Sequence, residues 1–316
     1  MVVPLVESTF RPPWYLRNCH VQTVLPVLAA RGAGTEFRSE RLELPDGDFL
    51  DLDWIESGHE RLAILCSGLE GNSRDAGMLR LARSFAAAGW DVLSWNYRGC
   101  SGVLNRLVRS YHSGATEDLA AIIAHAGGRP VALVGCSIGG NLVLKYLGEA
   151  TPPANVLAAA AISAPVDLAS TARALDRRPG NRIYLRRLIS SLRKKIRAKA
   201  AAMPGRISLD GLAGLHGFEH FDDRYTAPTH GFANAEDYWK KCSARQFLHA
   251  IGVPALLLSA KDDPFLTPES FPFSEAADNP QLTLEVPGAG GHLGFLDTGG
   301  SWIGCRVPGF LSRFVL

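Results

Sequence analysis

Five short runs of apolar residues, separated by segments with helical spacing, constrain the fold of this chain most. Runs that are apolar throughout suit strands that are buried on both faces of a parallel sheet. Strand and helix in alternation predict an α/β fold, with a mostly parallel central sheet and helices on both faces. The apolar runs are 62–66, 91–95, 130–136, 156–163 and 253–259, and the helical segments are 76–88, 115–126 and 138–149.

The remaining segments divide the chain into an arm and two pieces of core. With 316 residues, the chain is long enough for one large domain with a sizeable core. A hairpin is predicted before the first apolar run, because 36–44 and 49–55 alternate around a Pro-Asp-Gly turn. We expect a core of 36–166 and 246–316. Residues 1–35, rich in proline and aromatics, are expected to pack on it as an arm with little regular structure.

Residues 167–245 are too many for a loop without structure of its own, so we expect a helical cap inserted between two strands of the core. Within it, 182–206 holds nine Arg or Lys and no acidic residue. Its apolar residues form one stripe at helical spacing, namely Leu185, Leu188, Ile189, Leu192 and Ile196. Basic residues fall on the other side, namely Arg186, Arg187, Arg193, Lys194 and Arg197. We expect a solvent-exposed helix face, and the alternative is peripheral contact with an anionic membrane.

Composition excludes several classes of function. A net charge of +2 is too small to indicate a nucleic-acid partner. The cysteines lack CxxC pairs and zinc-ligand spacing, which favours reduced thiols in a cytoplasmic protein. The first residues lack a signal-peptide pattern, and no uncharged apolar run reaches membrane-spanning length. We expect neither a metal nor a cofactor, because no ligand cluster or Gly-rich phosphate loop stands in the required context.

A Gly-x-Ser-x-Gly motif at 135–139 lies between a predicted strand and a predicted helix. Strand, sharp turn and helix are the context in which this motif forms a nucleophile elbow. Gly135 and Gly139 have no Cβ to collide with neighbouring backbone in so tight a turn. The turn exposes the Ser137 hydroxyl above the sheet edge, where the helix N-terminus favours developing negative charge. The motif therefore predicts Ser137 as a nucleophile.

A serine hydroxyl is a poor nucleophile until a base takes its proton. In folds with such an elbow, an acid and then a histidine follow the serine along the chain. The next-to-last predicted strand runs into Asp262 and Asp263. We favour Asp263 as the acid, because Pro and Phe follow it, and Asp262 stays the alternative. The last predicted strand, 281–286, leads into a glycine-rich loop that ends at His292, which we predict as the general base for Ser137.

The oxyanion of a tetrahedral intermediate needs two backbone N–H groups aimed at it. We assign one to Ile138, the residue after the predicted nucleophile. The other should come from the loop 67–71, Ser-Gly-Leu-Glu-Gly, which follows the apolar run at 62–66. We assign Leu69 as this donor, with Gly68 permitting the turn.

These motifs resemble those of the YheT-like branch of the α/β-hydrolases, and the resemblance covers nearly the whole chain. That branch holds esterases and acylglycerol lipases, and its eukaryotic relatives include medium-chain acyltransferases and membrane-anchored lipid hydrolases. The matching segments are Asn18-Cys19-His20-Val21-Gln22-Thr23, Gly68-Leu69-Glu70-Gly71, Asn96-Tyr97-Arg98-Gly99-Cys100, Gly135-Cys136-Ser137-Ile138-Gly139-Gly140-Asn141, Asp262-Asp263-Pro264-Phe265 and Gly291-His292-Leu293-Gly294-Phe295.

The resemblance implies the α/β-hydrolase fold and hydrolysis of carboxylic esters, with the catalytic roles on the residues already named. One departure is Ser67, because the family usually has histidine before Gly68. The oxyanion donor is a backbone group, so this departure changes little. For His20 and Gln22 of the first motif we expect a structural role, pinning the arm to the core.

Motifs and resemblance together predict a serine hydrolase that acts through an acyl-enzyme. The expected substrate is a small-molecule ester with a short to medium acyl chain, or a lipid-like ester. Thioesterase or acyltransferase activity would use the same residues. The alternative outside the enzymes is a non-catalytic ligand-binding protein with the same fold. Such proteins usually lack a residue of the catalytic triad or of the nucleophile elbow.

Overall fold

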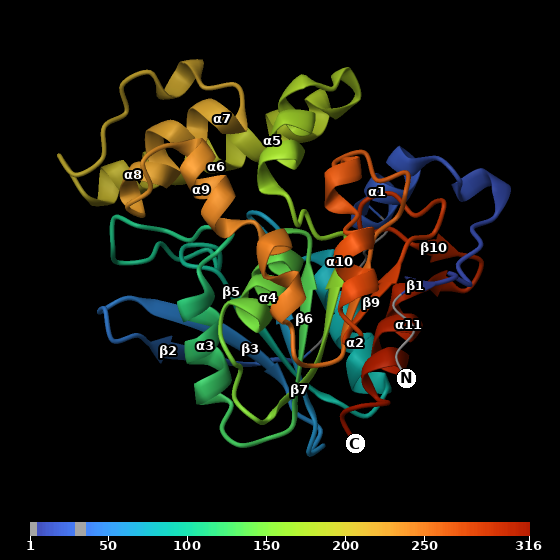
Figure 1. Cartoon of the computed structure of the whole chain (residues 1–316). Coiled ribbons are helices and arrows are strands. Elements are labelled where there is room, and N and C mark those ends of the chain that lie inside the picture. Colours follow the sequence, from blue (N-terminus) through green and yellow to red (C-terminus); the bar gives the residue numbers. More distant parts are fainter. Residues whose placement is uncertain (1–4, 29–35) are drawn as a thin grey trace.

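The computed structural model describes residues 5–28 and 36–316, and within them a nine-stranded sheet forms the centre of the molecule (Figure 1). The strand order is β1-β9-β8-β7-β6-β4-β5-β3-β2. Strand β3 pairs antiparallel with β2 and with β5, and the other pairs are parallel. The strands are β1 (Leu5–Val6), β2 (Arg38–Glu43), β3 (Phe49–Ile55), β4 (Leu62–Cys66), β5 (Asp91–Asn96), β6 (Val131–Cys136), β7 (Val156–Ile162), β8 (Ala255–Leu258) and β9 (Leu282–Glu285).

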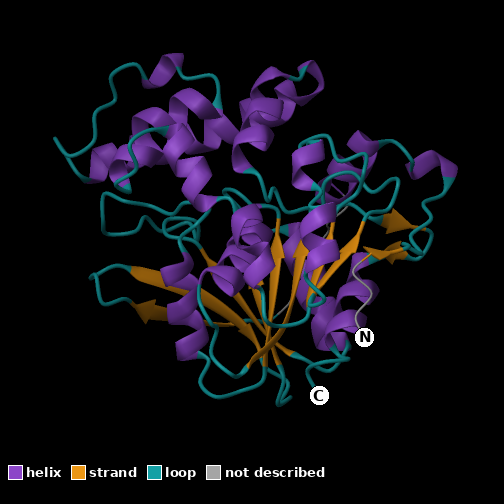
Figure 2. Ribbon diagram, in the orientation of Figure 1, coloured by secondary structure: helices purple, strands orange, loops and turns teal. Residues whose placement is uncertain are grey.

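Helices cover both faces of the sheet, as Figure 2 shows. Every residue of β4, β5 and β6 is buried, so their side chains need apolar partners on both sides. Ile64 and Leu93 pack with one set of helices, and their neighbours Leu65 and Val92 pack with the other. The first set is α3 (Thr116–His125) and α4 (Ile138–Glu149), and the second is α2 (Ala76–Ala87) and α11 (Ile303–Leu311). The predicted fold class is therefore confirmed.

A second layer of helices lies above the carboxyl ends of the parallel strands (Figure 1). These helices have an apolar cluster of their own, which includes Leu185, Phe221 and Trp239. The layer falls within 167–245, the segment for which the sequence predicts a cap. Its helices are α5 (Leu168–Arg177), α6 (Arg182–Ala202), α7 (Phe218–Phe221), α8 (Ala227–Thr229) and α9 (Ala235–Cys242), with a π-helical turn at Asp222–Thr226.

Short elements complete the fold around this frame. Helix α10 (Phe273–Asp278) precedes β9 in the chain. After β9 comes a small hairpin of β10 (Leu296–Asp297) and β11 (Gly300–Ser301). Single 3-10 turns occur at Trp14–Leu16, Pro179–Asn181, Leu212–Gly214 and Pro268–Ser270, with a longer 3-10 segment at Ala244–Ala250.

Helix α6 presents the predicted apolar stripe to the cap cluster, where Leu185 and Ile189 are buried. Most of its basic residues face solvent, among them Arg186, Arg187, Lys194 and Arg197. Two lysines outside the predicted basic face, Lys195 and Lys199, turn inward instead. Lys199 is completely buried and donates to Asn105 Oδ1, to the carbonyls of Val108 and Arg109, and to Ser110 Oγ, at 2.8–3.0 Å.

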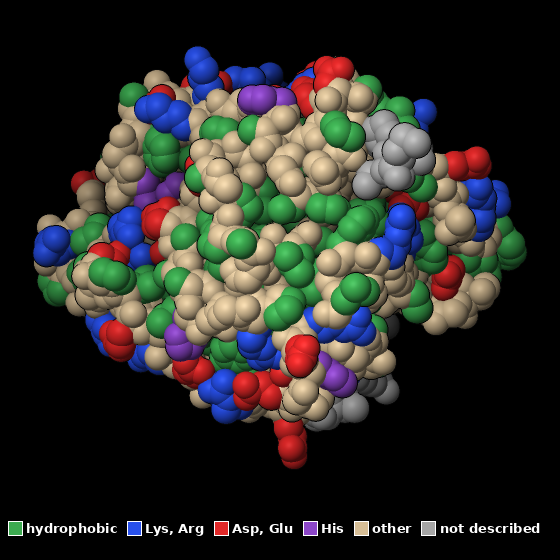
Figure 3. Space-filling model, turned by 60° about the horizontal axis from the view of Figure 1, so that its bottom comes forward, with side chains coloured by type: hydrophobic (Ala, Val, Ile, Leu, Met, Phe, Trp, Pro, Cys, Tyr) green, Lys and Arg blue, Asp and Glu red, His purple; other side chains and the backbone are tan. Residues whose placement is uncertain are grey.

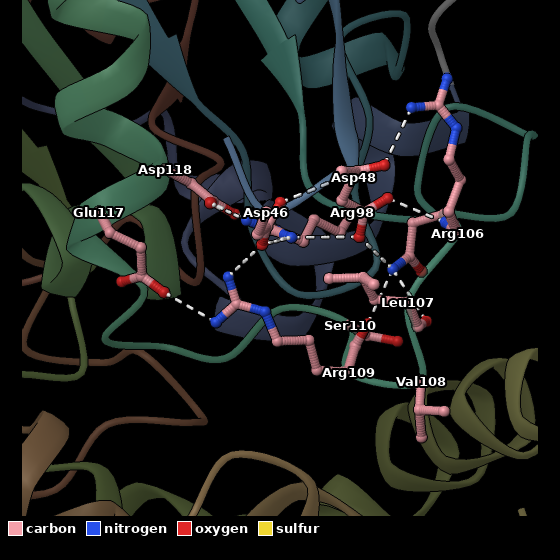
Figure 4. A network of polar contacts seen from close by, with 12 residues as sticks. Asp46, Asp48, Arg98, Arg106, Leu107, Val108, Arg109, Ser110, Glu117 and Asp118 are labelled. Atoms are coloured by element: carbon pink, nitrogen blue, oxygen red, sulfur yellow. Dashed lines mark hydrogen bonds and ion pairs between the residues drawn. The ribbon is translucent and has the colours of Figure 1, made fainter. Parts of the chain in front are cut away.

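The loop that receives Lys199 is held by a buried ion-pair network (Figure 4). The Arg98 guanidinium, 3% exposed, donates to Asp118 at 2.7 and 2.9 Å, to Asp46 at 2.7 Å and to Asp48 at 3.1 Å. Asn105 also donates to Asp48, at 2.7 Å. Removing one member of such a network leaves buried charge without a partner, which costs about 3–5 kcal/mol. The motif around Arg98 therefore fixes the loop beneath helix α6.

The arm contains more regular structure than the sequence predicts. Helix α1 (Cys19–Leu28) and strand β1, which pairs with β9, both lie in it, so the prediction of little regular structure is wrong. Pro26 inside α1 weakens the helical signal, and tertiary contacts stabilise the helix instead. Residues 1–4 and 29–35 of the predicted arm lie outside the described residues.

Gln22 of α1 has the expected structural role. It is completely buried and donates to the carbonyls of Leu16 and Leu296 at 2.8 and 2.9 Å, while its Oε1 accepts from the Leu296 N–H at 2.8 Å. His20 makes a different contact from the expected one, because its Nδ1 lies 3.0 Å from the hydroxyl of Tyr184 on helix α6. Gln22 thus fastens the arm to the core, and His20 fastens it to the cap.

The surface carries charges of both signs. On the face that Figure 3 shows, acidic and basic side chains are interspersed with hydrophobic ones. Across residues 5–28 and 36–316, no helix combines the length and apolar character needed to cross a membrane.

Candidate active site

Ser137 lies in a strained turn between β6 and α4. Its backbone has φ 54° and ψ −123°, a region that non-glycine residues rarely adopt. The turn requires glycine on both sides: a Cβ on Gly135 would lie 2.1 Å from the Gly139 carbonyl oxygen, and one on Gly139 would lie 2.4 Å from the Cys66 carbonyl oxygen. The Ser137 N–H donates to Ile162 O at 2.8 Å, which ties the turn to β7.

His292 and Asp263 form a hydrogen-bonded chain with this serine. With its proton on Nδ1, the His292 imidazole donates to Asp263 Oδ2 at 2.8 Å, and Nε2 accepts from the Ser137 hydroxyl at 3.0 Å. The side chains of His292 and Asp263 are 9% and 0% exposed. Asp263 Oδ1 accepts from the Phe265 N–H at 2.9 Å, which orients the carboxylate. The three residues that the sequence places on separate loops meet at one point.

Asp262, the alternative acid, points elsewhere. Its Oδ1 accepts from the Gly291 N–H at 2.9 Å, so it contacts the backbone next to His292 rather than the imidazole. Burial raises the pKa of the Asp262 carboxyl above its usual value. Its contact is with the loop that carries the histidine.

Helix α1 of the arm supports the same loop from the other side. Thr23 Oγ1 accepts from the His292 N–H at 2.9 Å and donates to Cys19 O at 2.7 Å. A Cβ on Gly291 would lie 2.4 Å from Cys19 O, and one on Gly294 would lie 2.1 Å from Gln22 O, so α1 leaves room only for glycine. Thr23 ends the first family motif, but its residue type and position do not by themselves mark it as a site residue.

An aromatic stack lies against the imidazole. The Phe265 ring centroid is 4.4 Å from that of His292, and Tyr184 of helix α6 meets Phe265 edge-on at 4.9 Å. Tyr184 of the cap therefore reaches the candidate base through Phe265, which belongs to the core. Apolar cover of this kind shields the hydrogen bonds of a site from water.

The loop 67–71 passes close to Ser137. A Cβ on Gly68 would be 3.4 Å from Ser137 Cβ, so the backbone of this loop runs beside the hydroxyl. The N–H groups of Leu69 and Ile138 have no acceptor among the described residues. Two free donors beside a nucleophile can stabilise an oxyanion. Ser67, at the position of the family histidine, is buried, and within the described residues its hydroxyl has no hydrogen-bond partner.

A cavity of about 140 Å³ lies between the core and the cap, and both candidate oxyanion residues line it. Most of its wall is apolar or aromatic, as expected for a site that binds a small organic molecule. Helix α6 contributes Leu192 and Ile196 from its apolar stripe. Other apolar and aromatic residues of the wall include Leu168, Ala172, Leu175, Phe218, Phe221, Tyr225 and Trp239.

Burial shifts the pKa values of two ionisable side chains in this wall, Asp222 and His112, toward their neutral forms. Burial raises the pKa of Asp222 to about 7, although Thr226 Oγ1 and Trp239 Nε1 donate to its carboxylate at 2.6 and 2.8 Å. Burial likewise lowers the pKa of His112 to about 3. A wall with few charges suits an apolar ligand.

In the part of the chain that the structure describes, no group of three or more His, Cys, Asp or Glu is placed to hold a metal ion.

Comparisons with known proteins identify the family of the chain. Residues 64–298 match the model of the alpha/beta hydrolase fold family. The chain is 36% identical to "Putative esterase YheT" of Escherichia coli (strain K12), over 98% of this chain and 94% of that protein. It is 27% identical to phospholipase ABHD3 of Mus musculus, over 95% of this chain and 75% of that protein.

Among solved structures, the Pyrococcus furiosus esterase Pf2001 shares the fold. The TM-score is 0.61 at 18% sequence identity, and the likeness covers 90% of this chain and 96% of that one.

Fold, elbow and relatives define the class of protein as an α/β-hydrolase. The chain belongs to the alpha/beta hydrolase fold family, in its YheT-like branch. The predictions of fold and family are confirmed, and the names of the relatives agree with ester hydrolysis as the general activity.

Proposed function

We propose that this protein is a serine esterase that cleaves carboxylic esters through an acyl-enzyme on Ser137. The single observation that carries the proposal is the hydrogen-bonded chain from Ser137 through His292 to Asp263, at 3.0 and 2.8 Å. A serine becomes nucleophilic when a base is oriented by a third group in this way.

In the acylation step, His292 Nε2 takes the proton as Ser137 Oγ attacks the ester carbonyl carbon. Asp263 stabilises the imidazolium that forms. The carbonyl oxygen becomes an oxyanion, which the N–H groups of Leu69 and Ile138 stabilise. Loss of one such donor costs about 100- to 1000-fold in kcat. His292 then protonates the departing alkoxide, and the ester bond breaks to leave acyl-Ser137 and the alcohol.

In the deacylation step, His292 takes a proton from water, and the resulting hydroxide attacks the acyl carbon. A second oxyanion forms in the same position and collapses as His292 returns the proton to Ser137 Oγ. The products are a carboxylic acid and the free enzyme. If an alcohol replaces water in the deacylation step, the same residues carry out acyl transfer. If a thioester replaces the ester in the acylation step, they carry out thioester cleavage.

The cavity beside Leu69 and Ile138 supports a proposal for the substrate class. We propose that it receives the acyl chain, short to medium in length, because its wall is mainly apolar and includes Leu192 and Ile196. Each methylene buried contributes about 0.8 kcal/mol. We expect kcat/KM to rise from acetate toward octanoate until the chain fills the cavity.

The test is a p-nitrophenyl ester series from acetate to palmitate, with wild type and Ser137→Ala. We expect hydrolysis by wild type, loss of it in the variant, and labelling of Ser137 by a fluorophosphonate probe. A protein that binds the esters but neither turns them over nor reacts with the probe would be a ligand-binding protein instead. A flat or falling kcat/KM from acetate to octanoate would contradict the acyl assignment alone.

We also propose that the exposed face of α6 contacts an anionic membrane surface. Ile183 on this helix is 78% exposed beside Arg182, Arg186 and Arg187. An exposed apolar residue among basic ones is typical of helices at a lipid interface. Sedimentation with phosphatidylglycerol vesicles should retain the protein, and Arg186→Gln with Arg187→Gln should weaken retention. Equal retention by neutral phosphatidylcholine vesicles would contradict the charge argument.

A further inference from the structure

Glu70 connects the candidate oxyanion loop to the cap. It directly follows Leu69, its backbone has φ 57°, and its side chain is 9% exposed. One carboxylate oxygen accepts from Lys195 Nζ at 2.5 Å, and the other accepts from Ser191 Oγ at 2.8 Å. Both donors belong to helix α6. The carboxylate of one loop residue is thus held by two side chains of a helix more than a hundred positions away along the chain.

Tyr111 closes the arrangement from the core side. Its hydroxyl accepts from the Glu70 N–H at 2.7 Å and donates to Glu70 Oε1 at 3.0 Å. The Lys195 ammonium lies 4.9 Å from the Tyr111 ring centroid. Both the backbone and the side chain of Glu70 are therefore fixed. The Leu69 N–H belongs to the preceding peptide unit, which is joined to Glu70 only through the φ and ψ angles of Leu69. Because the Glu70 backbone and side chain are held in place, the direction of the Leu69 N–H depends on these contacts.

Holding the cap in place does not require this buried ion pair. The cap has its own apolar cluster, and Lys199, one helical turn beyond Lys195, anchors α6 to the loop at 105–110. Burying two charges costs desolvation that their attraction offsets only with good geometry, so buried pairs contribute little to stability. A role in positioning accounts for the placement of Glu70 better than a role in stability.

We propose that Glu70 is a positioning residue, which aims the Leu69 N–H at the oxyanion only while helix α6 is seated over the cavity. The proposal rests on the esterase function proposed above and deepens it. Helix α6 also lines the cavity with Leu192 and Ile196, and Glu70 and Lys195 line it as well. An acyl chain that packs on this helix therefore favours the seated position, so that longer chains raise kcat as well as affinity.

The experiment compares Glu70→Gln and Lys195→Met with Lys194→Met, whose lysine is the exposed neighbour on the same helix. Steady-state kinetics are measured with p-nitrophenyl octanoate and acetate. We expect kcat on the octanoate to fall by about 10- to 100-fold in both test variants, since small misplacement of a catalytic group costs this much. KM should stay within about twofold. Lys194→Met should match wild type.

A trifluoromethyl ketone, which forms a tetrahedral adduct with a serine, provides the second measurement. Its affinity depends on the oxyanion donors, so it should weaken in parallel with kcat/KM in Glu70→Gln. A purely structural role predicts a lowered Tm and a reduced fraction of active protein, with unchanged kcat per labelled active site. Active-site titration with a fluorophosphonate therefore separates positioning from folding.

Ser191→Ala removes one hydrogen bond to the Glu70 carboxylate and no charge. This variant keeps the proposal testable if Glu70→Gln does not fold. We expect a smaller fall in kcat, about 3- to 10-fold, at unchanged KM. Unchanged kcat per labelled site in every folded test variant, or a rise in KM alone, would overturn the positioning role. Wild type without ester turnover and without probe labelling would instead overturn the esterase function itself.

Discussion

Thr23, on the helix near the start of the chain, accepts a hydrogen bond from the His292 N–H at 2.9 Å, across 269 positions of sequence. The arm therefore touches the backbone of the candidate base. Because the imidazole must reach both Ser137 and Asp263, this contact helps to set where the base lies.

Replacing Thr23 with valine removes the acceptor and keeps the shape. We expect kcat to fall by about 5- to 10-fold, because one hydrogen bond contributes about 0.5–1.5 kcal/mol. Thr23→Ser, which keeps the hydroxyl, should retain most activity. Kinetics per titrated active site check the expectation, and equal activity of the two variants would show that the contact does not position the base.

The two neighbouring aspartates should respond differently to amide substitution. Asp263→Asn removes the carboxylate that accepts from His292 Nδ1, and we expect kcat to fall by about 10,000-fold, as in other triads. Asp262→Asn changes only a contact with the Gly291 N–H, so the loss should be far smaller. The ratio of the two kcat values is the measurement, and a larger loss for Asp262→Asn would reverse the assignment of the acid.

Narrowing the cavity should shorten the preferred acyl chain. Ala172 is buried in the cavity wall, and Ala172→Phe fills space that we assign to the chain. We expect kcat/KM on octanoate to fall by about tenfold or more, while acetate hydrolysis is retained, since each lost methylene contact is worth about 0.8 kcal/mol. Ala201→Phe, on the exposed side of helix α6, is the matched control. A parallel loss on both esters would indicate disruption rather than narrowing.

Asp222 should make stability depend on pH. Burial raises its pKa from 3.8 to about 7 in the folded protein, so the folded state binds the proton more tightly than the unfolded state does. The stabilisation from this proton is complete below about pH 4 and is lost as the pH rises through about 7. The free energy of unfolding of wild type, measured against Asp222→Asn, should therefore decline between pH 5 and 8. A constant difference over that range would contradict the raised pKa.

Much of the fold was predictable because it follows from local patterns. The apolar runs of β4, β5 and β6 identify strands that are buried on both faces, and the elbow around Ser137 follows from two glycines that tolerate no Cβ. Asp263 and His292 were predictable from their order after strands, since chain order in such a sheet fixes which loops meet at its edge.

The contacts that tune the site were not predictable from local patterns. Thr23 and Lys195 act through partners far away in sequence, and no periodicity indicates such pairs. Lys199 belongs to a strongly basic segment that suggests solvent exposure, yet it is completely buried because loop carbonyls and side-chain oxygens surround its ammonium. Helix α1 was missed because Pro26 and the preceding prolines weaken its signal, while docking on the loop of His292 stabilises it.

Strand β1 pairs with β9, and helix α1 docks on the loop that follows β9, so the arm can reach its final position only after this loop has been synthesised. The arm leaves the ribosome before its partner at His292, which follows Thr23 by 269 positions. At ordinary elongation rates of about 5–20 residues per second, the arm waits roughly 15–50 s for its docking site. During that interval its apolar side chains are open to chaperones. Ser137 and Asp263 are both translated before His292, so the three candidate residues can meet only after the loop of His292 has been made.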